Sequence, residues 1–419
     1  MVTKRSGQRT TVVTPDGLHV RFVEADNIGS LWQEIENRVG SNSLACSWLW
    51  TESWLRHYGD MIPHRFVVGE RDAAVAIALI TEGAGKKIGP FNIRTLHLGT
   101  SGEPDTETVR VQYNRVLAPI EERDSFVRGV IELARVSGSR WDQFHLDGFS
   151  RDDLPQGIEL EPSFESLRDV CCITDLAAIR SSGKTVIAAL DSHAAKSIRR
   201  SIRFVEEDHG PIRIEWADSI EHAHDIFDEM VKLHEARWAA KGQPGVFSSA
   251  RFAGFHREIV QKAFPNGGVL LARVKAGEMT LGCDYSLIER NRVLSYQWGI
   301  AQLKNKRASP GLVIGATVMQ EALQRGLDEF DWLAGDAFYK RQLTTTSREL
   351  VWIRTSQGAR IQAIYKLVEA KNLAQRIPVP SKKQPFEGSA QSDEPTGLVR
   401  KYLNILVPQR DDIQSIRAK

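Results

Sequence analysis

The chain has 419 residues, with 55 Lys and Arg against 53 Asp and Glu, so its formal net charge is +2. Hydrophobic residues make up 42% and charged residues 26%, which is typical of a globular protein and excludes a wholly disordered chain. The length predicts two or three domains. Because the overall charge is near neutral, any anion-binding site must be a local cluster.

Several classes of site are excluded by the same inspection. No stretch approaches 18 consecutive apolar residues, and the N-terminus lacks the apolar segment of a secretory signal. The four cysteines, Cys46, Cys171, Cys172 and Cys283, form no CxxC pair and have no histidine pair at ligand spacing near them. We therefore expect a cytoplasmic protein with reduced thiols, no membrane span and no metal.

The first half of the chain reads as short strands and helices in alternation. The expected elements are a strand from 18, helices over 28–39 and 48–58, a hairpin that turns at 70–72, a strand at 95–100, a helix at 126–136 and a strand at 141–149. They follow from apolar residues that recur at helical spacing or alternate with polar ones. We expect an N-terminal unit of residues 18–175, preceded by a disordered N-terminus at 1–17.

The second half repeats this order more clearly. The expected elements are a helix at 192–205, a strand at 213–217, helices at 220–240 and 250–264, three strands between 269 and 300, a helix at 311–326 and a strand at 329–335. Both halves thus read as one α/β fold used twice, each a mixed sheet flanked by helices, without a visible residue-level repeat. The C-terminal unit is expected over 176–376, a flexible linker over 377–397 and a short helix within 398–419.

A basic loop leads into the helix at 311–326. Ser309 suits an N-cap and Pro310 suits the first helical position. A helix start leaves amide N–H groups unpaired and carries a partial positive charge, and Gly311 has no side chain to block an anion. This pattern predicts a binding site for a phosphate or pyrophosphate. The alternative is an ordinary capped helix that follows a solvated loop. The residues expected to hold the phosphates are Lys304, Lys306, Arg307, Ser309, Gly311 and Leu312.

Strands, a phosphate-binding turn, a helix and a further strand follow the order by which GNAT-superfamily acetyltransferases hold coenzyme A. The segments LHEARW (233–238), SPG (309–311) and DWLAGDAFYK (331–340) resemble GNAT-like acyltransferases of the CelD/BcsL type, linked to cellulose and exopolysaccharide synthesis. That family is similar to the Fem-type peptidyltransferases, which have two tandem GNAT-like units. The segment WLWTESWLRHYG (48–59) looks like the family's first unit, so the resemblance spans residues 20–355.

One departure from ordinary GNAT enzymes concerns the donor. Their Q/RxxGxG/A loop is absent, and ASPGLVIGA (308–316) stands in its place. The GNAT resemblance implies acetyl-CoA or another acyl-CoA as co-substrate and no metal, whereas the Fem-type resemblance implies aminoacyl-tRNA. The net charge of +2 and sparse aromatic residues among the cations favour the first, so we expect no nucleic-acid partner.

The resemblance also suggests the reacting groups. Asp284 stands where GNAT enzymes often carry a general base, Tyr339 where a tyrosine can protonate the leaving thiolate, and Lys340 where a cation can neutralise a phosphate or an oxyanion. His234 belongs to the LHxxRW motif, which suggests acceptor positioning or proton transfer, and its helical spacing puts it on a buried face. For each residue the alternative is a purely structural role.

Further residues are candidates for substrate contact. Arg237 is expected to bind a substrate anion or to form a surface salt bridge, and Trp238 follows it in the motif. Tyr296 and Trp298 are two apart on one strand, so we expect them on one face, lining an acyl or sugar pocket or packing in the core. A basic helical stripe, either solvated or used for approach of a phosphorylated donor, consists of Lys196, Arg199, Arg200 and Arg203.

The sequence therefore predicts an N-acyltransferase that moves an acyl group from acyl-CoA to an amine or hydroxyl of a saccharide or envelope-related acceptor. Direct attack in a ternary complex needs no covalent enzyme intermediate. The alternatives are a Fem-type transferase that uses aminoacyl-tRNA and a non-catalytic GNAT-like scaffold in polysaccharide biosynthesis.

Overall fold

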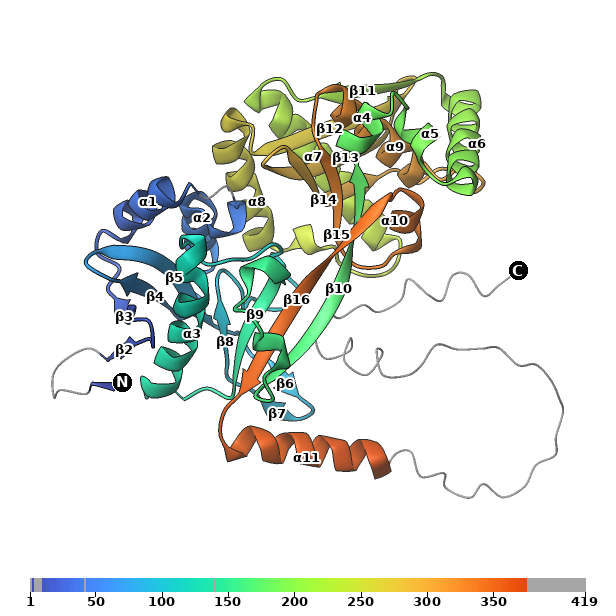
Figure 1. Cartoon of the computed structure of the whole chain (residues 1–419). Coiled ribbons are helices and arrows are strands. Elements are labelled where there is room, and N and C mark those ends of the chain that lie inside the picture. The colour runs from blue at the N-terminus through green and yellow to red at the C-terminus, as the bar shows by residue number, and fades with distance from the viewer. Residues whose placement is uncertain (1, 4–9, 41–42, 139, 375–419) are drawn as a thin grey trace, which may run out of the picture.

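The computed structural model describes residues 2–3, 10–40, 43–138 and 140–374, and within them one sheet of 14 strands runs through the molecule (Figure 1). The sheet order is β1-β2-β3-β4-β5-β8-β9-β16-β10-β15-β14-β13-β12-β11. Its strands are β1 (Val2–Thr3), β2 (Thr11–Val13), β3 (His19–Val23), β4 (His64–Glu70), β5 (Ala74–Glu82), β8 (Thr95–Leu98), β9 (Gln143–Ser150), β10 (Phe164–Asp175), β11 (Ile212–Trp216), β12 (Val269–Ala276), β13 (Met279–Glu289), β14 (Arg292–Ile300), β15 (Glu329–Ala334) and β16 (Thr346–Ser356).

A separate hairpin pairs β6 (Lys87–Ile88) with β7 (Phe91–Asn92). The α-helices are α1 (Ile28–Val39), α2 (Trp48–Tyr58), α3 (Ile120–Val136), α4 (Leu176–Ser181), α5 (Val186–Ala189), α6 (Ser192–His209), α7 (Ile220–Ala239), α8 (Ala250–Ala263), α9 (Pro310–Gln324), α10 (Phe338–Gln342) and α11 (Ala359–Ala374). No described helix is long and apolar enough to cross a bilayer.

The two halves of the chain follow the same path. In each, a strand, two helices and three antiparallel strands are followed by a helix and a strand parallel to the third strand of the three. The parallel pairs are β8 with β9 in the first unit and β14 with β15 in the second. The predicted α/β fold of two tandem units is therefore confirmed.

A long two-stranded ribbon joins the units into one sheet. β10 and β16 pair over ten positions, while β16 also pairs with β9 and β10 with β15 (Figure 1). The predicted boundaries assign 346–374 to the C-terminal unit, but β16 pairs with the N-terminal unit. α11 also packs on that unit, where Ile361 and Ile364 are buried with Ile88 and Ile93.

The expected disordered N-terminus at 1–17 is wrong over its described end. Thr11–Val13 form β2, which pairs with β3, and Val12 is buried against the core of the N-terminal unit. The edge of a sheet has unpaired backbone groups, which this strand satisfies in part. The expected linker at 377–397 and helix within 398–419 lie outside the described residues.

Helices cover both faces of the sheet, and separate apolar cores lie between the helices and the sheet. α3 covers one face of the N-terminal unit, and α6 and α9 cover one face of the C-terminal unit. A third cluster spans both units and takes in residues of α1, α2, α7 and α8. α2 and α8 lie side by side, with the Trp50 and Phe255 ring centroids 4.8 Å apart and His57 Nε2 2.9 Å from Glu258 Oε2.

Gly299 in β14 provides a test of how closely α7 packs on the sheet. A Cβ at Gly299 would lie 2.3 Å from the Met230 carbonyl oxygen and 2.9 Å from Leu233 Cβ. Because both obstacles belong to the packed helix, we expect Gly299→Ala to lower the free energy of unfolding by about 1–3 kcal/mol in chemical denaturation.

The matched control is Gly311→Ala, since a Cβ at Gly311 would meet Ile300 Cδ1 at an ordinary 3.5 Å. Gly311 lies inside α9, so this variant is expected to be neutral or more stable by up to about 1 kcal/mol. Equal stability of the two variants would contradict the close approach of α7 to β14.

Candidate active site

β14 and β15 separate at the place where the sequence predicts the reaction. Their parallel register holds for three positions, from Arg292 opposite Glu329 to Leu294 opposite Asp331. β14 continues to Ile300, but the described strands share no later pair. Ile300 lies beside the first turn of α9, so the strands diverge next to the N-terminus of this helix.

Two irregularities in the backbone accompany this separation. The register between β13 and β14 shifts between Ser295 and Gln297, which leaves Tyr296 as the extra residue of a β-bulge. Leu333, in β15, has φ of 59°, a left-handed conformation that costs a residue with a side chain about 1–3 kcal/mol. Bulges and strained residues of this kind are common beside functional sites.

The bulge makes the expected common face of Tyr296 and Trp298 wrong. Tyr296 packs with the core under α7 and α8, and its hydroxyl donates to the Val109 carbonyl oxygen at 2.6 Å. Trp298 packs with the core under α9, and its indole N–H donates to Ser295 Oγ at 2.8 Å. One inserted residue reverses the alternation of a strand, so the two rings cannot line one pocket.

The N-terminus of α9 holds the residues of the predicted anion-binding site. Pro310 is the first helical residue, but the Ser309 side chain makes no capping hydrogen bond. The Ser309 amide instead donates to Ser201 Oγ at 3.3 Å, and the Leu312 amide donates to the Ser309 carbonyl oxygen at 3.1 Å. Leu312 therefore offers no spare donor. The half-buried Gly311 has ordinary contact space in front of its Cα.

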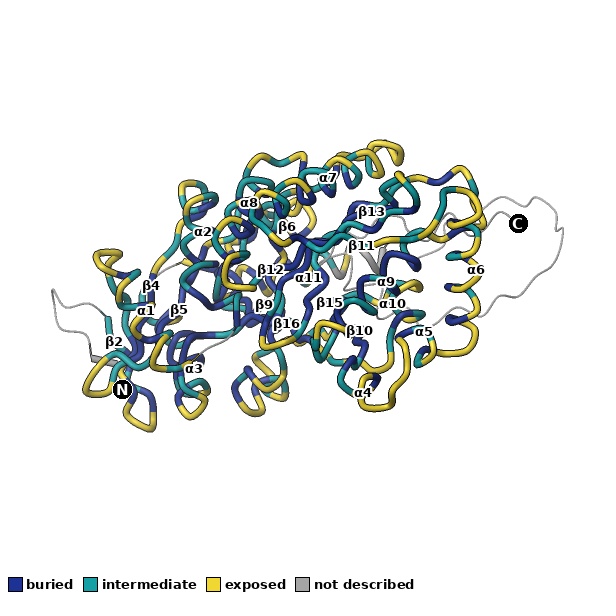
Figure 2. The backbone as a smooth tube through the Cα atoms, turned by 90° about the horizontal axis from the view of Figure 1, so that it is seen from above, coloured by how far each residue is buried: buried dark blue, intermediate teal, exposed yellow. Residues whose placement is uncertain are grey.

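The predicted basic loop continues into the basic stripe of α6. The Phe204 ring contacts two guanidinium groups, with Arg203 Cζ 5.3 Å and Arg307 Cζ 4.6 Å from its centroid. Asn305 Nδ2 donates to Asp208 Oδ2 at 2.8 Å and fixes the loop to the same helix. Figure 2 shows α6 at one end of the molecule with exposed turns on its outer side. We call the exposed cations Lys196, Arg199, Arg200, Arg203, Lys304, Lys306 and Arg307 the basic surface.

Asp284 is fully buried in β13 on the face covered by α9. Its neighbours Cys283 and Tyr285 face α7 and α8, so alternation turns Asp284 toward α9. Ser286 Oγ lies 3.0 Å from Oδ1 and 2.8 Å from Oδ2 and donates to this carboxyl group. Burial raises the pKa of Asp284 to about 7, which suits a general base at neutral pH. Burial also raises the pKa of the Cys283 thiol, so this cysteine lacks the character of a nucleophile.

Tyr339 and Lys340 lie where β15 ends. Lys340 Nζ donates to the carbonyl oxygens of Leu333 at 3.2 Å and Ala334 at 3.0 Å, and burial lowers its pKa. Lys340 therefore holds the end of the strained strand. The Tyr339 side chain is 45% exposed, and its ring centroid lies 6.2 Å from that of Trp332.

His234 lies in α7, on the opposite face of the sheet from Asp284. His234 Nδ1 is 3.2 Å from Glu235 Oε1, and His234 Nε2 accepts a hydrogen bond from the Trp238 indole at 3.0 Å. Burial lowers the pKa of His234. The predicted buried position is correct, and Arg237 is exposed one turn away. The structure thus brings His234 and Trp238 together but separates both from Asp284.

Two features near the diverging strands were missed by the sequence analysis. The Tyr113 hydroxyl, from the N-terminal unit, donates to buried Asp331 Oδ2 in β15, and the Arg292 guanidinium lies 4.1 Å from the Tyr113 ring centroid. The Trp332 indole N–H is buried and has no acceptor among the described residues. Its ring centroid is 5.3 Å from that of Trp298, across the separated strands. Spacing along the sequence carries no signal for either feature.

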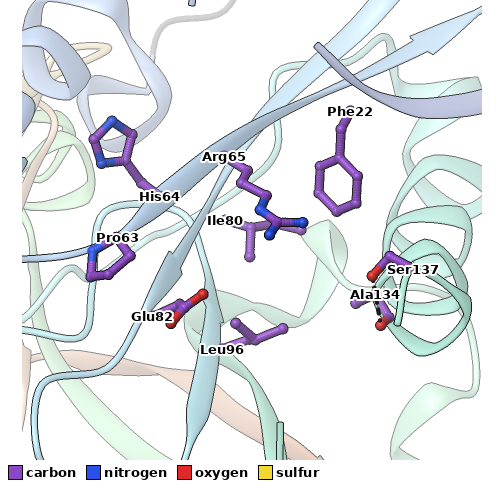
Figure 3. Close-up of a pocket in the computed structure, with 9 residues that line it drawn as sticks. All are labelled: Phe22, Pro63, His64, Arg65, Ile80, Glu82, Leu96, Ala134 and Ser137. Atoms are coloured by element: carbon purple, nitrogen blue, oxygen red, sulfur yellow. Dashed lines mark hydrogen bonds between the residues drawn. The ribbon is translucent and has the colours of Figure 1, made fainter. Parts of the chain in front are cut away.

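A cavity of about 120 Å³ lies elsewhere, in the N-terminal unit (Figure 3). It is lined by Phe22, Pro63, His64, Arg65, Ile80, Glu82, Leu96, Ala134 and Ser137. None of these is a predicted site residue, and the volume is well below that of typical ligand pockets. We therefore do not assign the reaction to this cavity.

Comparison with known proteins gives one family match, which lies in the C-terminal unit. A family model described as an acetyltransferase (GNAT) domain matches residues 192–341, from the start of α6 into α10. A search of curated proteins found no match.

Solved structures of low sequence identity align with most of this chain. FemX aligns with a TM-score of 0.51 and 11% identity, over 81% of this chain and 98% of FemX. L-PGS from Bacillus licheniformis aligns with 0.48 and 11%, over 83% and 97% of the two chains. A tandem GNAT protein from the clavulanic acid biosynthesis pathway aligns with 0.42 and 10%, over 82% and 99%. Residues 192–341 thus match the model of a GNAT-type acetyltransferase domain, within a chain whose overall fold is similar to that of FemX.

Proposed function

We propose that the protein is an N-acyltransferase that moves an acyl group from acyl-CoA to an amine or hydroxyl of a saccharide or envelope-related acceptor, as in the CelD/BcsL type. The observation that carries this proposal is the separation of β14 and β15 beside the N-terminus of α9. This separation provides a route for a narrow, extended donor with its phosphates at the helix. A cytoplasmic location belongs to the proposal, because acyl-CoA is available there.

The donor phosphates bind at the start of α9. The Gly311 amide and the partial positive charge of the helix attract the diphosphate, and Lys304, Lys306 and Arg307 supply opposite charge. The Ser309 amide already donates to Ser201 and so is not a donor to the diphosphate. Ser309 instead helps to hold the turn that precedes the helix. The acyl end then extends between β14 and β15, where the buried Trp332 N–H is available to its carbonyl oxygen.

Proton transfer is assigned to Asp284 and Tyr339. The acceptor amine attacks the thioester carbonyl, a C–N bond forms, and the amine proton passes to the Asp284 carboxylate through a bound water. The C–S bond breaks, and the Tyr339 hydroxyl gives its proton to the thiolate, which leaves as the CoA thiol. Lys340 acts as a positioning residue because its ammonium is bound to the carbonyl groups at the end of β15.

Gly311→Asp separates donor binding from stability. A carboxylate in the first turn of a helix is favourable for the helix but repels a diphosphate at the same amides. We expect this variant to keep its melting temperature and to lose binding of CoA or acetyl-CoA by at least about tenfold in calorimetry. Gly311→Ala has room for its Cβ and adds no charge, so it should lose much less binding than Gly311→Asp does.

The loop cations are tested in the same assay. Lys304→Ala with Lys306→Ala should weaken CoA binding by about five- to tenfold at low salt. Lys232→Ala, an exposed cation on α7, is the control and should leave binding unchanged. Wild-type protein that does not bind CoA at millimolar concentration, or a Gly311→Asp variant that binds normally, would contradict the donor site.

The pKa of about 7 for Asp284 predicts a pH dependence. The ionised carboxylate is the base, so kcat/KM should rise about tenfold per pH unit below 7 and level off above it. Asp284→Asn should lower kcat by about 10²- to 10⁴-fold and remove this dependence. The exposed Asp72→Asn is the control and should keep the wild-type profile.

The raised pKa of the Asp284 carboxyl group also predicts that protein stability depends on pH, which can be measured without an activity assay. Its pKa is raised on folding, so the folded state is favoured most below about pH 4, and this stabilisation is lost as pH rises through about 7. The full change is about 4 kcal/mol, and Asp284→Asn should flatten it. A wild-type pH–stability curve that Asp284→Asn leaves unchanged would show that the carboxyl group is not buried as described.

A Fem-type transferase that uses aminoacyl-tRNA is the second candidate, favoured by the extent of the basic surface. Phe204 contacts both Arg203 of α6 and Arg307 of the loop, so the basic surface is continuous from the helix to the loop. The loop cations alone would be enough to bind a diphosphate. A polynucleotide backbone contacts cations over a longer distance and makes binding strongly salt-dependent.

Charge removal on α6 distinguishes the two donors. For acyl-CoA, the triple variant Lys196→Ala, Arg199→Ala, Arg200→Ala should bind the donor as the wild type does. For aminoacyl-tRNA, this variant should bind tRNA more weakly and with a shallower dependence on salt, by about one in slope for each lost phosphate contact. Filter binding across a salt series measures this slope. Binding of neither donor would leave the scaffold role.

A further inference from the structure

The N-terminal unit contains a cluster of two imidazoles and one carboxylate. His97 in β8 is directly opposite His145 in β9, and Asp147 follows two residues later on the same face of β9. His97 Nδ1 lies 2.6 Å from Asp147 Oδ2, and His145 Nδ1 lies 3.8 Å from Asp147 Oδ1. The three groups each offer one ligand atom, and these atoms lie within 4.8 Å of one another. The cluster lies in the parallel pair that corresponds to β14 and β15.

Both imidazoles are held by a neighbour on their own strand. His97 Nε2 is 3.0 Å from Thr95 Oγ1, and His145 Nε2 is 2.9 Å from Gln143 Oε1. Gln143 Oε1 can only accept, so His145 carries its proton on Nε2 and keeps a lone pair on Nδ1. Metal-binding histidines are typically oriented by such a partner on the other ring nitrogen.

The surroundings of the three side chains allow a cation to reach them. His97 and His145 are buried, and the Asp147 side chain is 15% exposed, which gives a route from solvent. Ser101 Oγ donates to Asp147 Oδ2 at 3.1 Å and orients the carboxylate. Lys86 is half-buried nearby and forms no ion pair with Asp147 among the described residues, and its flexible side chain can turn outward.

We propose that His97, His145 and Asp147 bind one divalent transition metal ion of the Zn²⁺ class and so clamp β8 to β9. Two imidazole nitrogens and a carboxylate oxygen are ligands that Zn²⁺ accepts, with a fourth position left for water. The ion would take the place of the direct contact between His97 Nδ1 and Asp147 Oδ2. Tetrahedral coordination at about 2.0–2.1 Å requires Nδ1 and Oδ2 to move from 2.6 Å to about 3.3 Å apart.

The test uses the full-length protein, dialysed against a chelator and then titrated with Zn²⁺ by calorimetry and with Co²⁺ by visible absorption. One equivalent should bind, with the visible bands of low-coordinate Co²⁺ and a raised melting temperature. Asp147→Asn and His145→Gln remove a ligand each. Thr95→Val keeps all three ligands and loses one orienting contact, so it should weaken binding by about tenfold and less than the ligand variants do.

His19→Gln, an exposed histidine on β3 outside the cluster, is the matched control and should bind as the wild type does. Circular dichroism establishes that each variant is folded, and Thr95→Val keeps the test valid where a ligand variant does not fold. Failure of the wild type to bind Zn²⁺, or binding that Asp147→Asn and Thr95→Val leave unchanged, would overturn the proposal. Neither outcome depends on acyl-transfer activity.

Discussion

The early end of hydrogen bonding between β14 and β15 is the constraint on which the proposed reaction depends. Two parallel strands in register leave no space between them, and a donor cannot reach the middle of a continuous sheet. Here the bulge at Tyr296 and the left-handed Leu333 turn the strands apart after three pairs. Lys340 holds the carbonyl groups at the end of β15, and so helps to maintain the strained conformation.

The two units share a topology but differ in the charge at the corresponding helix. α9 begins without acidic residues and follows a basic loop, whereas α3 has Glu121 and Glu122 in its first turn. Acidic side chains at a helix N-terminus occupy the position that an anion would take. In place of a phosphate seat, the N-terminal unit has the buried imidazole and carboxylate groups between β8 and β9. The two units thus share one sheet and one topology but carry different groups at corresponding positions.

Local signals in the sequence were sufficient for most of the fold. Apolar spacing predicted α1 and α2 with the bounds that the structure has, and Pro310 correctly marked the start of α9. The ribbon of β10 and β16 could not be predicted, because it pairs residues from 164 onward with residues up to 355. Pairing at such separation depends on tertiary structure rather than on local preference.

The candidate site was predictable in composition and less so in geometry. The cations before Gly311 and the aspartate at 284 can be read from the sequence, but the bulge that separates Tyr296 from Trp298 has no local marker. His97 is far in sequence from His145, so only strand pairing brings their nitrogens together.

The most direct test of the proposed donor site is a crystal structure of the protein with bound CoA. We expect the diphosphate at the Gly311 amide and the sulfur between β14 and β15. A CoA molecule bound elsewhere, or a Gly311 amide covered by protein, would contradict this expectation.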